Sequence, residues 1–192
     1  MARQKEFDRD VALAEAVKVF ASHGYEGAST DTLLSQMGIS RQSMYDTFGD
    51  KRRLYLEALQ HYSSSSTADI IAAMNSAASP VKGLEAALMT IASRPASQPY
   101  DGCLGVSAVS EYGRSDRDVS AMTDASGATL VSAFEKIIVK GKAAGEVASD
   151  VDVKATAQFM RAILSGLKIS ARAGAAPDSL RKIVRVALRS LR

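Results

Sequence analysis

Apolar residues recur every three or four positions along almost the whole chain, which is the spacing of one face of an α-helix. The sequence contains no convincing run that alternates strictly between apolar and polar residues, as a half-buried β-strand would. The pattern therefore predicts an all-α fold.

Residues that cap helices, and residues that break them, divide this pattern into separate helices. Ser29, Ser40 and Asp50 are candidate N-caps, because a short side-chain oxygen there accepts a hydrogen bond from a free backbone N–H group. The first helix should end at Gly24, and the run Ser63–Ser66 should bend or break the fourth. The amino-terminal helices are thus predicted over residues 8–22, 29–36, 40–47 and from 51 onward.

Longer helices follow in the second part of the chain. Pro80 suits the first turn of a helix that ends near Arg94 and Pro95. The next stretch, "RPASQPYDG", is the most loop-like in the sequence. Three further helices are predicted over residues 103–112, 116–144 and 152–172, and Pro177 opens a last one.

Two of the short helices meet at the turn "MGIS", which is the layout of a helix-turn-helix. Gly38 gives this turn the backbone freedom that it needs. The helix after the turn would enter the major groove, with Arg41, Gln42 and Ser43 at its exposed amino end. Arg pairs with guanine and Gln with adenine, so we expect these three side chains to read bases.

Three other side chains are expected to contact DNA phosphates. The Tyr45 hydroxyl can donate to a phosphate, and Lys51 begins the following helix beside backbone amides that attract anions. Ser29 begins the helix before the turn and completes the set. Met44 and Phe48 should face inward. The same pattern is also typical of a three-helix packing unit whose polar residues simply face solvent.

Charge does not decide between these two interpretations. The chain has a formal net charge of +3, yet residues 1–60 carry eight basic and nine acidic side chains. A DNA-binding surface in this segment therefore requires its charges to be sorted onto one face.

The stretches "FASHGYEGAS", "MGISRQSMYDTFGDK" and "LYLEAL" resemble the amino-terminal domain of the tetracycline-repressor (TetR) family of bacterial transcriptional regulators. The resemblance covers about Phe7–Leu59. The matching positions are Phe20, Gly24, Tyr25, Gly38, Ile39, Ser40, Tyr45, Phe48, Lys51 and Leu54. It implies a helix-turn-helix DNA-binding domain over residues 1–55 and a larger helical ligand-binding and dimerisation domain over residues 56–192.

Two positions depart from the family pattern. Leu34 stands where the family usually has alanine, and Gln42 where glycine is frequent. Leu34 implies a different packing beside the turn, and Gln42 adds a side chain that can read a base. Both departures concern the operator sequence more than the fold.

The last two predicted helices each carry an apolar stripe. A monomer core and a dimer contact explain such stripes equally well from the pattern alone. The resemblance implies a homodimer in which these helices pair across a two-fold axis. The interface residues it assigns are Met160, Ile163, Leu164, Leu167, Ile183, Val184 and Leu188.

The resemblance also implies a pocket for a small-molecule inducer. Thioethers and aromatic rings suit an adaptable apolar pocket, although they equally suit a filled core. The candidate lining residues are Met89, Cys103, Met122, Phe134 and Phe159. Cys103 has two further interpretations: a reactive thiol that senses electrophiles or redox state, and a small buried apolar side chain.

Other classes of function find less support. His23 and His61 have no nucleophile and carboxylate at motif-like spacing, so we expect neither an enzyme, nor a metal site, nor a cofactor. No apolar run is long enough to span a membrane, and no apolar region follows "MARQKEFDRD", which predicts a cytoplasmic protein. A basic amphipathic last helix lying on a membrane, and a helical ligand-binding dimer without DNA binding, remain the alternatives.

These patterns together predict a ligand-responsive transcriptional regulator, most simply a repressor that a small molecule releases from DNA. Its expected partners are double-stranded DNA with a palindromic operator, an unidentified inducer and a second copy of the chain. The sequence does not specify the operator, the inducer or the regulated genes.

Overall fold

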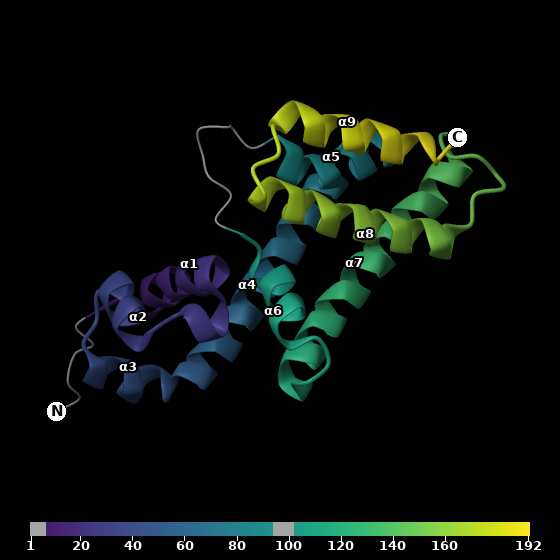
Figure 1. Ribbon diagram of the computed structural model, residues 1–192. Helices are drawn as coiled ribbons and strands as arrows, with labels where there is room; N and C mark the ends of the chain where they lie inside the picture. Colours follow the sequence, from purple (N-terminus) through teal and green to yellow (C-terminus); the bar gives the residue numbers. More distant parts are fainter. Residues whose placement is uncertain (1–6, 94–101) are drawn as a thin grey trace. The chain divides into compact units, whose positions relative to one another are not determined.

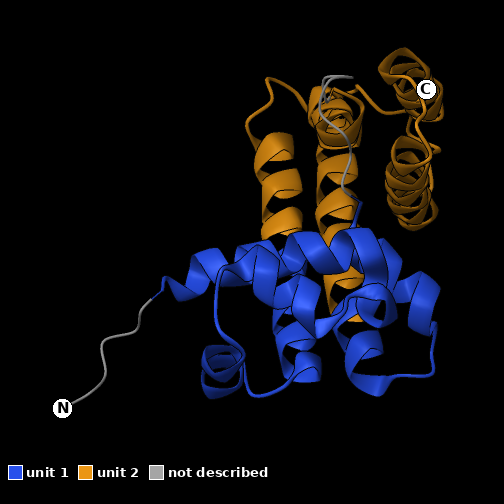
Figure 2. Ribbon diagram, turned by 60° about the vertical axis from the view of Figure 1, so that its left-hand side comes forward, with its two compact units in different colours: residues 1–63, 101–123 blue, residues 64–100, 124–192 orange. Residues whose placement is uncertain are grey.

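The computed structural model describes residues 7–93 and 102–192, and these residues form helices without any strand (Figure 1). The prediction of an all-α fold is confirmed. The chain divides into two compact units, residues 1–63 with 101–123 (unit 1) and residues 64–100 with 124–192 (unit 2) (Figure 2). The division follows packing, so the sequence boundary after residue 55 stays a prediction.

Unit 1 contains three amino-terminal helices, of which the second and third are short, the first half of a long helix, and a later segment of the chain. The helices are α1 (Arg9–Gly27), α2 (Thr30–Met37), α3 (Arg41–Phe48), the beginning of α4 (Lys51–Asn75), α6 (Leu104–Tyr112) and the beginning of α7 (Arg117–Ala143). Phe20, Leu33, Met44 and Tyr55 are fully buried in its core, and Leu104 of α6 joins them there. The unit therefore includes residues that lie far from the helix-turn-helix in sequence.

Local capping explains where most of these helices begin. The Ser29 hydroxyl oxygen accepts a hydrogen bond from the Thr32 N–H, and the Ser40 hydroxyl oxygen accepts one from the Ser43 N–H. Gly38 ends α2 in the left-handed conformation, at φ 65°, where a side chain would be strained. The predicted starts of these helices are confirmed to within one residue.

Two local predictions in this part of the chain are wrong. The first helix does not end at Gly24: the backbone leaves helical geometry there, at φ 71°, and resumes a helical turn through Gly27. The run Ser63–Ser66 does not break α4, which continues to Asn75. Ser63 and Thr67 are both buried, so packing overrides the weak helix preference of serine.

Unit 2 is a helical layer structure with its own core. It contains the rest of α4 and α7, together with α5 (Pro80–Ala92), α8 (Val153–Arg172) and α9 (Pro177–Arg189). Helix α5 packs on α8 and α9, which also contact each other (Figure 1). Pro80 and Pro177 begin their helices as predicted, and Asp152 caps α8. The predicted loop after Arg94 lies almost entirely outside the described residues.

One glycine sets how closely three helices of unit 2 approach. A Cβ atom at Gly83 of α5 would lie 2.6 Å from the Met74 carbonyl oxygen of α4 and would also collide with the Ile137 side chain of α7. Backbone atoms cannot move aside cheaply, so the helix spacing depends on this missing side chain.

We expect Gly83→Ala to lower the free energy of unfolding by about 1–3 kcal/mol, because overpacking forces α5 away from its neighbours. Gly105→Ala is the matched control: it is also a helical glycine, and its nearest neighbour would be the Cys103 Sγ at 3.9 Å. Denaturation of both variants checks this. An equal stability of Gly83→Ala and wild type would contradict the packing argument.

Candidate nucleic-acid interface

Helix α3 presents a polar outer side and an apolar inner side. Met44 and Phe48 are buried against the core of unit 1, as predicted from the sequence. Arg41, Gln42 and Tyr45 are exposed on the opposite side. The turn at Gly38 and the Ser40 cap thus place the amino end of α3 on the surface, which is the position of a recognition helix.

The two candidate base-reading side chains are held by carboxylates of the same unit. One guanidinium nitrogen of Arg41 donates to Asp31 Oδ1 of α2 at 2.6 Å, and Gln42 Nε2 donates to Asp46 Oδ1 at 2.8 Å. The third candidate, Ser43, shares a 2.9 Å hydrogen bond between its hydroxyl and that of Ser40. All three side chains have partners within the protein, so a DNA base must compete with those partners.

The three candidate phosphate-binding residues differ in how far contacts within the protein already occupy their side chains. Tyr45 is 46% exposed on α3, so its side chain is accessible to a partner. Lys51 Nζ lies 4.4 Å from the centre of the Tyr25 ring, a cation–π contact that keeps the charge near the start of α4. The Ser29 hydroxyl is occupied in capping α2 and in a contact with Thr32.

Helix α6 is attached to the kink in α1. The two carboxylate oxygens of Glu111 accept hydrogen bonds from the backbone N–H groups of Tyr25 and Glu26, both at 2.9 Å. A Cβ atom at Gly24 would lie 2.8 Å from Glu111 Oε2, so the glycine makes room for this carboxylate. Glu111 therefore caps the last turn of α1 from a helix that begins about eighty residues later.

A cluster of aromatic rings lies beside this contact. Phe20, Tyr25, Tyr55 and Tyr112 join α1, α4 and α6, with ring centroids 5.1–6.4 Å apart. The hydroxyl groups of Tyr55 and Tyr112 are buried and have no hydrogen-bond partner among residues 7–93 and 102–192. Burial raises the pKa of Tyr112 to about 12 and raises that of Tyr55 further. Both phenols therefore stay neutral and act as packing groups.

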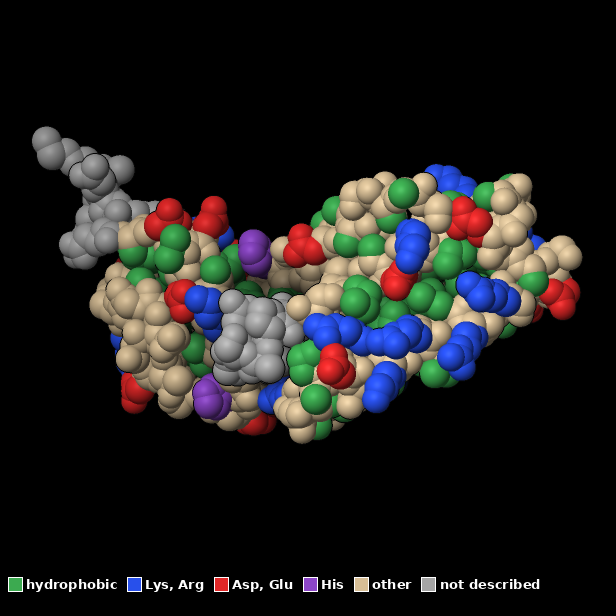
Figure 3. All heavy atoms as spheres, turned by 90° about the horizontal axis from the view of Figure 1, so that it is seen from above, with side chains coloured by type: hydrophobic (Ala, Val, Ile, Leu, Met, Phe, Trp, Pro, Cys, Tyr) green, Lys and Arg blue, Asp and Glu red, His purple; other side chains and the backbone are tan. Residues whose placement is uncertain are grey.

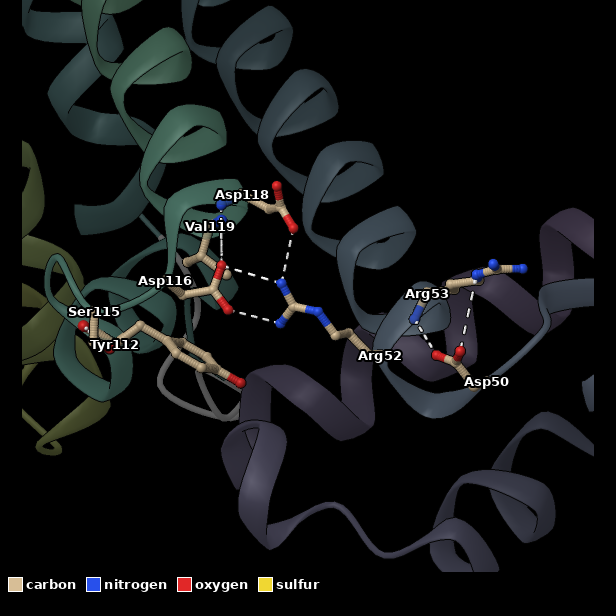
Figure 4. A network of polar contacts seen from close by, with 8 residues as sticks. All are labelled: Asp50, Arg52, Arg53, Tyr112, Ser115, Asp116, Asp118 and Val119. Atoms are coloured by element: carbon tan, nitrogen blue, oxygen red, sulfur yellow. Dashed lines mark hydrogen bonds and ion pairs between the residues drawn. The ribbon is translucent and has the colours of Figure 1, made fainter.

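An ion-pair network holds the start of α7 to the start of α4 within unit 1 (Figure 4). The Arg52 guanidinium donates to Asp116 Oδ2 at 2.7 Å and to Asp118 Oδ2 at 2.8 Å. The hydrogen bond from Arg52 lowers the pKa of Asp116, with a backbone hydrogen bond from Val119 as a further cause. Next to it, the Asp50 carboxylate caps α4 by accepting from the Arg53 N–H at 2.8 Å.

Most of these residues carry no signal in the sequence. Glu111, Asp116 and Asp118 lie outside the helix-turn-helix, and no local pattern connects them with it. Asp46 did have a signal, because it follows Gln42 by four residues and such pairs meet on a helix surface. Asp31 has none, since its contact to Arg41 depends on how α2 and α3 cross.

The seven residues assigned to the dimer interface separate into two groups. Met160, Leu164, Leu167 and Val184 are buried in the protomer's own core, while Ile163 and Leu188 are partly exposed and Ile183 is 38% exposed. The outward-facing apolar side chains of α8 and α9 are instead Phe159, Ile169, Ile183 and Val186. An apolar stripe identifies a buried face but not whether the chain itself or a partner buries it.

The five candidate pocket residues do not form one group within either unit. Cys103 and Met122 belong to unit 1, whereas Met89, Phe134 and Phe159 belong to unit 2. Phe134 is fully buried in the core, Phe159 is 39% exposed, and the Cys103 side chain is 5% exposed. A groove of about 820 Å³ does exist in unit 2, between α4 and α7, but none of the five lines it.

The described part of the chain offers neither a metal centre nor a membrane span. No three His, Cys, Asp or Glu side chains come together there as metal ligands would. None of its helices is both long and apolar enough to cross a bilayer. His23 and His61 are exposed, on α1 and α4.

Comparison with known proteins agrees with this geometry. Residues 12–58 match the family described as bacterial regulatory proteins, tetR family, and residues 80–187 match the tetracyclin repressor-like C-terminal domain. An uncharacterized HTH-type transcriptional regulator, YezE of Bacillus subtilis, is 30% identical over 98% of each chain. The HTH-type transcriptional repressor ComR of Escherichia coli is 29% identical, over 97% of this chain and 90% of that protein.

Solved structures agree as well. A cysteine mutant of the TetR family transcriptional regulator CifR, complexed with 26 bp double-strand operator DNA, superposes with a TM-score of 0.86. It is 31% identical, and the match covers 100% of both chains. Both family matches and the relative that is 30% identical over nearly the whole length show that this chain belongs to the tetR family of bacterial regulatory proteins.

Proposed function

We propose that the protein is a ligand-responsive transcriptional repressor that binds a palindromic operator as a homodimer and leaves it when a small molecule binds. The observation that carries the proposal is the exposed amino end of α3, where Arg41 and Gln42 stand on a helix positioned by the Gly38 turn and the Ser40 cap. The relationship to regulators such as ComR and CifR supports it.

Arg41 and Gln42 read bases in this proposal, with Ser43 in a lesser role. Arg matches guanine O6 and N7, and Gln matches adenine N6 and N7. Both must leave Asp31 and Asp46 to do so. When those contacts break, two carboxylates are left near the DNA. A DNA sequence whose bases form no hydrogen bonds with Arg41 and Gln42 is therefore bound weakly.

Tyr45, Lys51 and Ser29 hold phosphates and set the register of α3 in the groove. Tyr45 and Lys51 lie at the two sides of the α3–α4 turn, and Asp50 in that turn is occupied by the Arg53 N–H. Ser29 contacts DNA only in addition to its capping role.

A second copy of the chain packs on the outward apolar face of α8 and α9 in this proposal. Phe159, Ile169, Ile183 and Val186 are 38–62% exposed there, with Gly166 of α8 open to close approach by another helix. Exposed apolar side chains gathered on two adjacent helices are typical of an interface. A two-fold contact of this kind matches a palindromic operator.

The remaining assignments follow from the same proposal. The protein acts in the cytoplasm, where it meets DNA, and neither a catalytic step nor a cofactor is part of the mechanism. Cys103 is 5% exposed at the start of α6, which favours packing over electrophile sensing, because a sensor thiol must be reached by its reagent. The basic side of α9 gathers Lys and Arg side chains on the surface of unit 2 (Figure 3), and we interpret them as a solvated rim.

The overall test is selection of bound fragments from random duplex DNA. A palindromic consensus with a steep dependence of affinity on salt concentration supports the proposal. Binding without sequence preference, or no binding at all, rejects it.

Gln42→Ala should relax sequence preference at one position of each half-site and cost about 1–3 kcal/mol on the preferred base. Selection on the variant, followed by titration of single-base operator changes, measures this. The control is Gln158→Ala, an exposed glutamine on α8 of unit 2. If Gln42→Ala selects the same consensus as wild type, the proposed placement of α3 in the groove is wrong.

Lys51→Ala should weaken binding to all duplexes alike and reduce the slope of log affinity against log salt concentration by about 1. Lys154→Ala, which removes an exposed charge from α8, should leave the slope unchanged. The measurement is operator titration at four or more salt concentrations. A loss confined to the consensus sequence would mean that Lys51 reads a base instead.

Val186→Glu should give a folded monomer with greatly reduced operator affinity, because two-fold pairing would bury an unpaired carboxylate. Arg185→Glu changes the adjacent residue of α9, on its basic side, and should remain a dimer. Sedimentation and circular dichroism distinguish dissociation from unfolding. A dimeric Val186→Glu protein would move the interface elsewhere.

A further inference from the structure

The groove in unit 2 has the size and lining of a small-molecule site. It is open, has a volume of about 820 Å³, and lies between the last turn of α4 and one side of α7. Eight of its fourteen lining residues are apolar. Met74 and Ile137 are almost fully buried at its base, and Ile71, Pro80 and Ala133 are partly exposed around them. Such a lining binds a largely apolar body.

The charged residues of the groove are of one sign only. Lys136 and Lys140 line it, one turn apart on α7, and no carboxylate does. Neither lysine has an ion pair or hydrogen bond within the described part of the chain. The nearby Glu146 is engaged elsewhere, since its Oε2 accepts from the Ser79 hydroxyl at 2.8 Å and the Val81 N–H at 3.0 Å.

Uncharged polar groups add hydrogen-bond capacity on the same walls. Asn75 of α4 and Ser132 of α7 line the groove and have no partner among the residues that the structure describes. The Thr129 hydroxyl already donates to the Ala125 carbonyl oxygen at 2.9 Å and is left as an acceptor. Two cations and two free polar side chains therefore face one apolar base, and like charges four residues apart on α7 repel each other.

We propose that the groove binds a small amphipathic carboxylate, with its apolar body on the partly exposed Ile71, Pro80 and Ala133 and its carboxylate at Lys136 and Lys140. Charge complementarity decides the class: a cationic ligand is repelled, and a neutral one leaves both ammonium groups without a partner. As the site of the inducer, this inference rests on the proposed function.

The chain provides a direct connection between this groove and the DNA-binding helices. Helix α4 is one uninterrupted helix, about 37 Å long at 1.5 Å per residue. Lys51 begins it directly after α3, and Met74 and Asn75 in its last turn line the groove. A ligand that favours one position of this last turn acts on the same helix that follows the recognition helix.

The test uses the full chain without DNA and three probes of equal length: decanoate, decanamide and decylamine. Calorimetric titration should show binding of decanoate, at least tenfold weaker binding of decanamide, and none of decylamine. Lys136→Ala and Lys140→Ala should each weaken decanoate about two- to fivefold, as expected for loss of one exposed charged contact. Lys154→Ala on α8 should bind decanoate like wild type.

Three results would overturn the site: no decanoate binding by the folded protein, equal binding of all three probes, or an unchanged affinity in the Lys136→Ala, Lys140→Ala double variant. Operator titration of the same protein separates the two proposals. If the protein binds decanoate in this manner but binds no operator, the proposed ligand site stands and the proposed regulatory function is rejected. A protein that binds its operator but not decanoate retains the regulator and rejects this ligand.

Discussion

The carboxylate of Glu111 at the Gly24 kink is the interaction on which unit 1 depends. It joins α6 to α1 across 86 residues of sequence, through two hydrogen bonds to backbone N–H groups that would otherwise lack a partner at the start of a new helical turn. The absence of a side chain at Gly24 is a condition for this contact. Because the Glu111 carboxylate of α6 accepts both of these hydrogen bonds, a displacement of α6 within the unit would also move or break the last turn of α1.

The sequence predicted the local parts of this arrangement and not the long-range ones. Ser29, Ser40 and Asp50 could be identified as caps because their hydrogen bonds reach only three residues along the chain. Gly24 was recognised as a helix breaker, but the turn that follows depends on Glu111, which no local pattern connects with it. Likewise Ser63–Ser66 has the composition of a linker, while tertiary packing keeps it helical.

Helix α9 shows why the candidate interface was harder to predict than the helix itself. At 100° per residue, Leu180, Val184, Ala187 and Leu191 lie on one side and fill the core. Ile183 and Val186 lie on one flank of that side, and Arg185 and Arg189 lie on the far side of the helix. The apolar stripe read from the sequence was the core side, and only the exposed fractions reveal that a second, narrower apolar face remains uncovered. The period of apolar residues in the sequence identifies the positions buried in the protomer, whereas a candidate interface consists of apolar side chains that stay exposed after the protomer has folded.

In the proposed mechanism, the carboxylates that hold Arg41 and Gln42 influence how the protein selects its operator. The contacts of Arg41 and Gln42 in the free protein are exposed to solvent, so each is worth up to about 1 kcal/mol, whereas one good side-chain contact to a base is worth about 1–3 kcal/mol. Exchange at the correct base is therefore a gain, and exchange at a wrong base is a net loss. Since Asp31 and Asp46 also repel phosphates, they weaken binding to all DNA alike. The protein thus gives up affinity at the recognition helix and gains selectivity, and the affinity that remains must come from phosphate contacts and from the pairing of two chains on one operator.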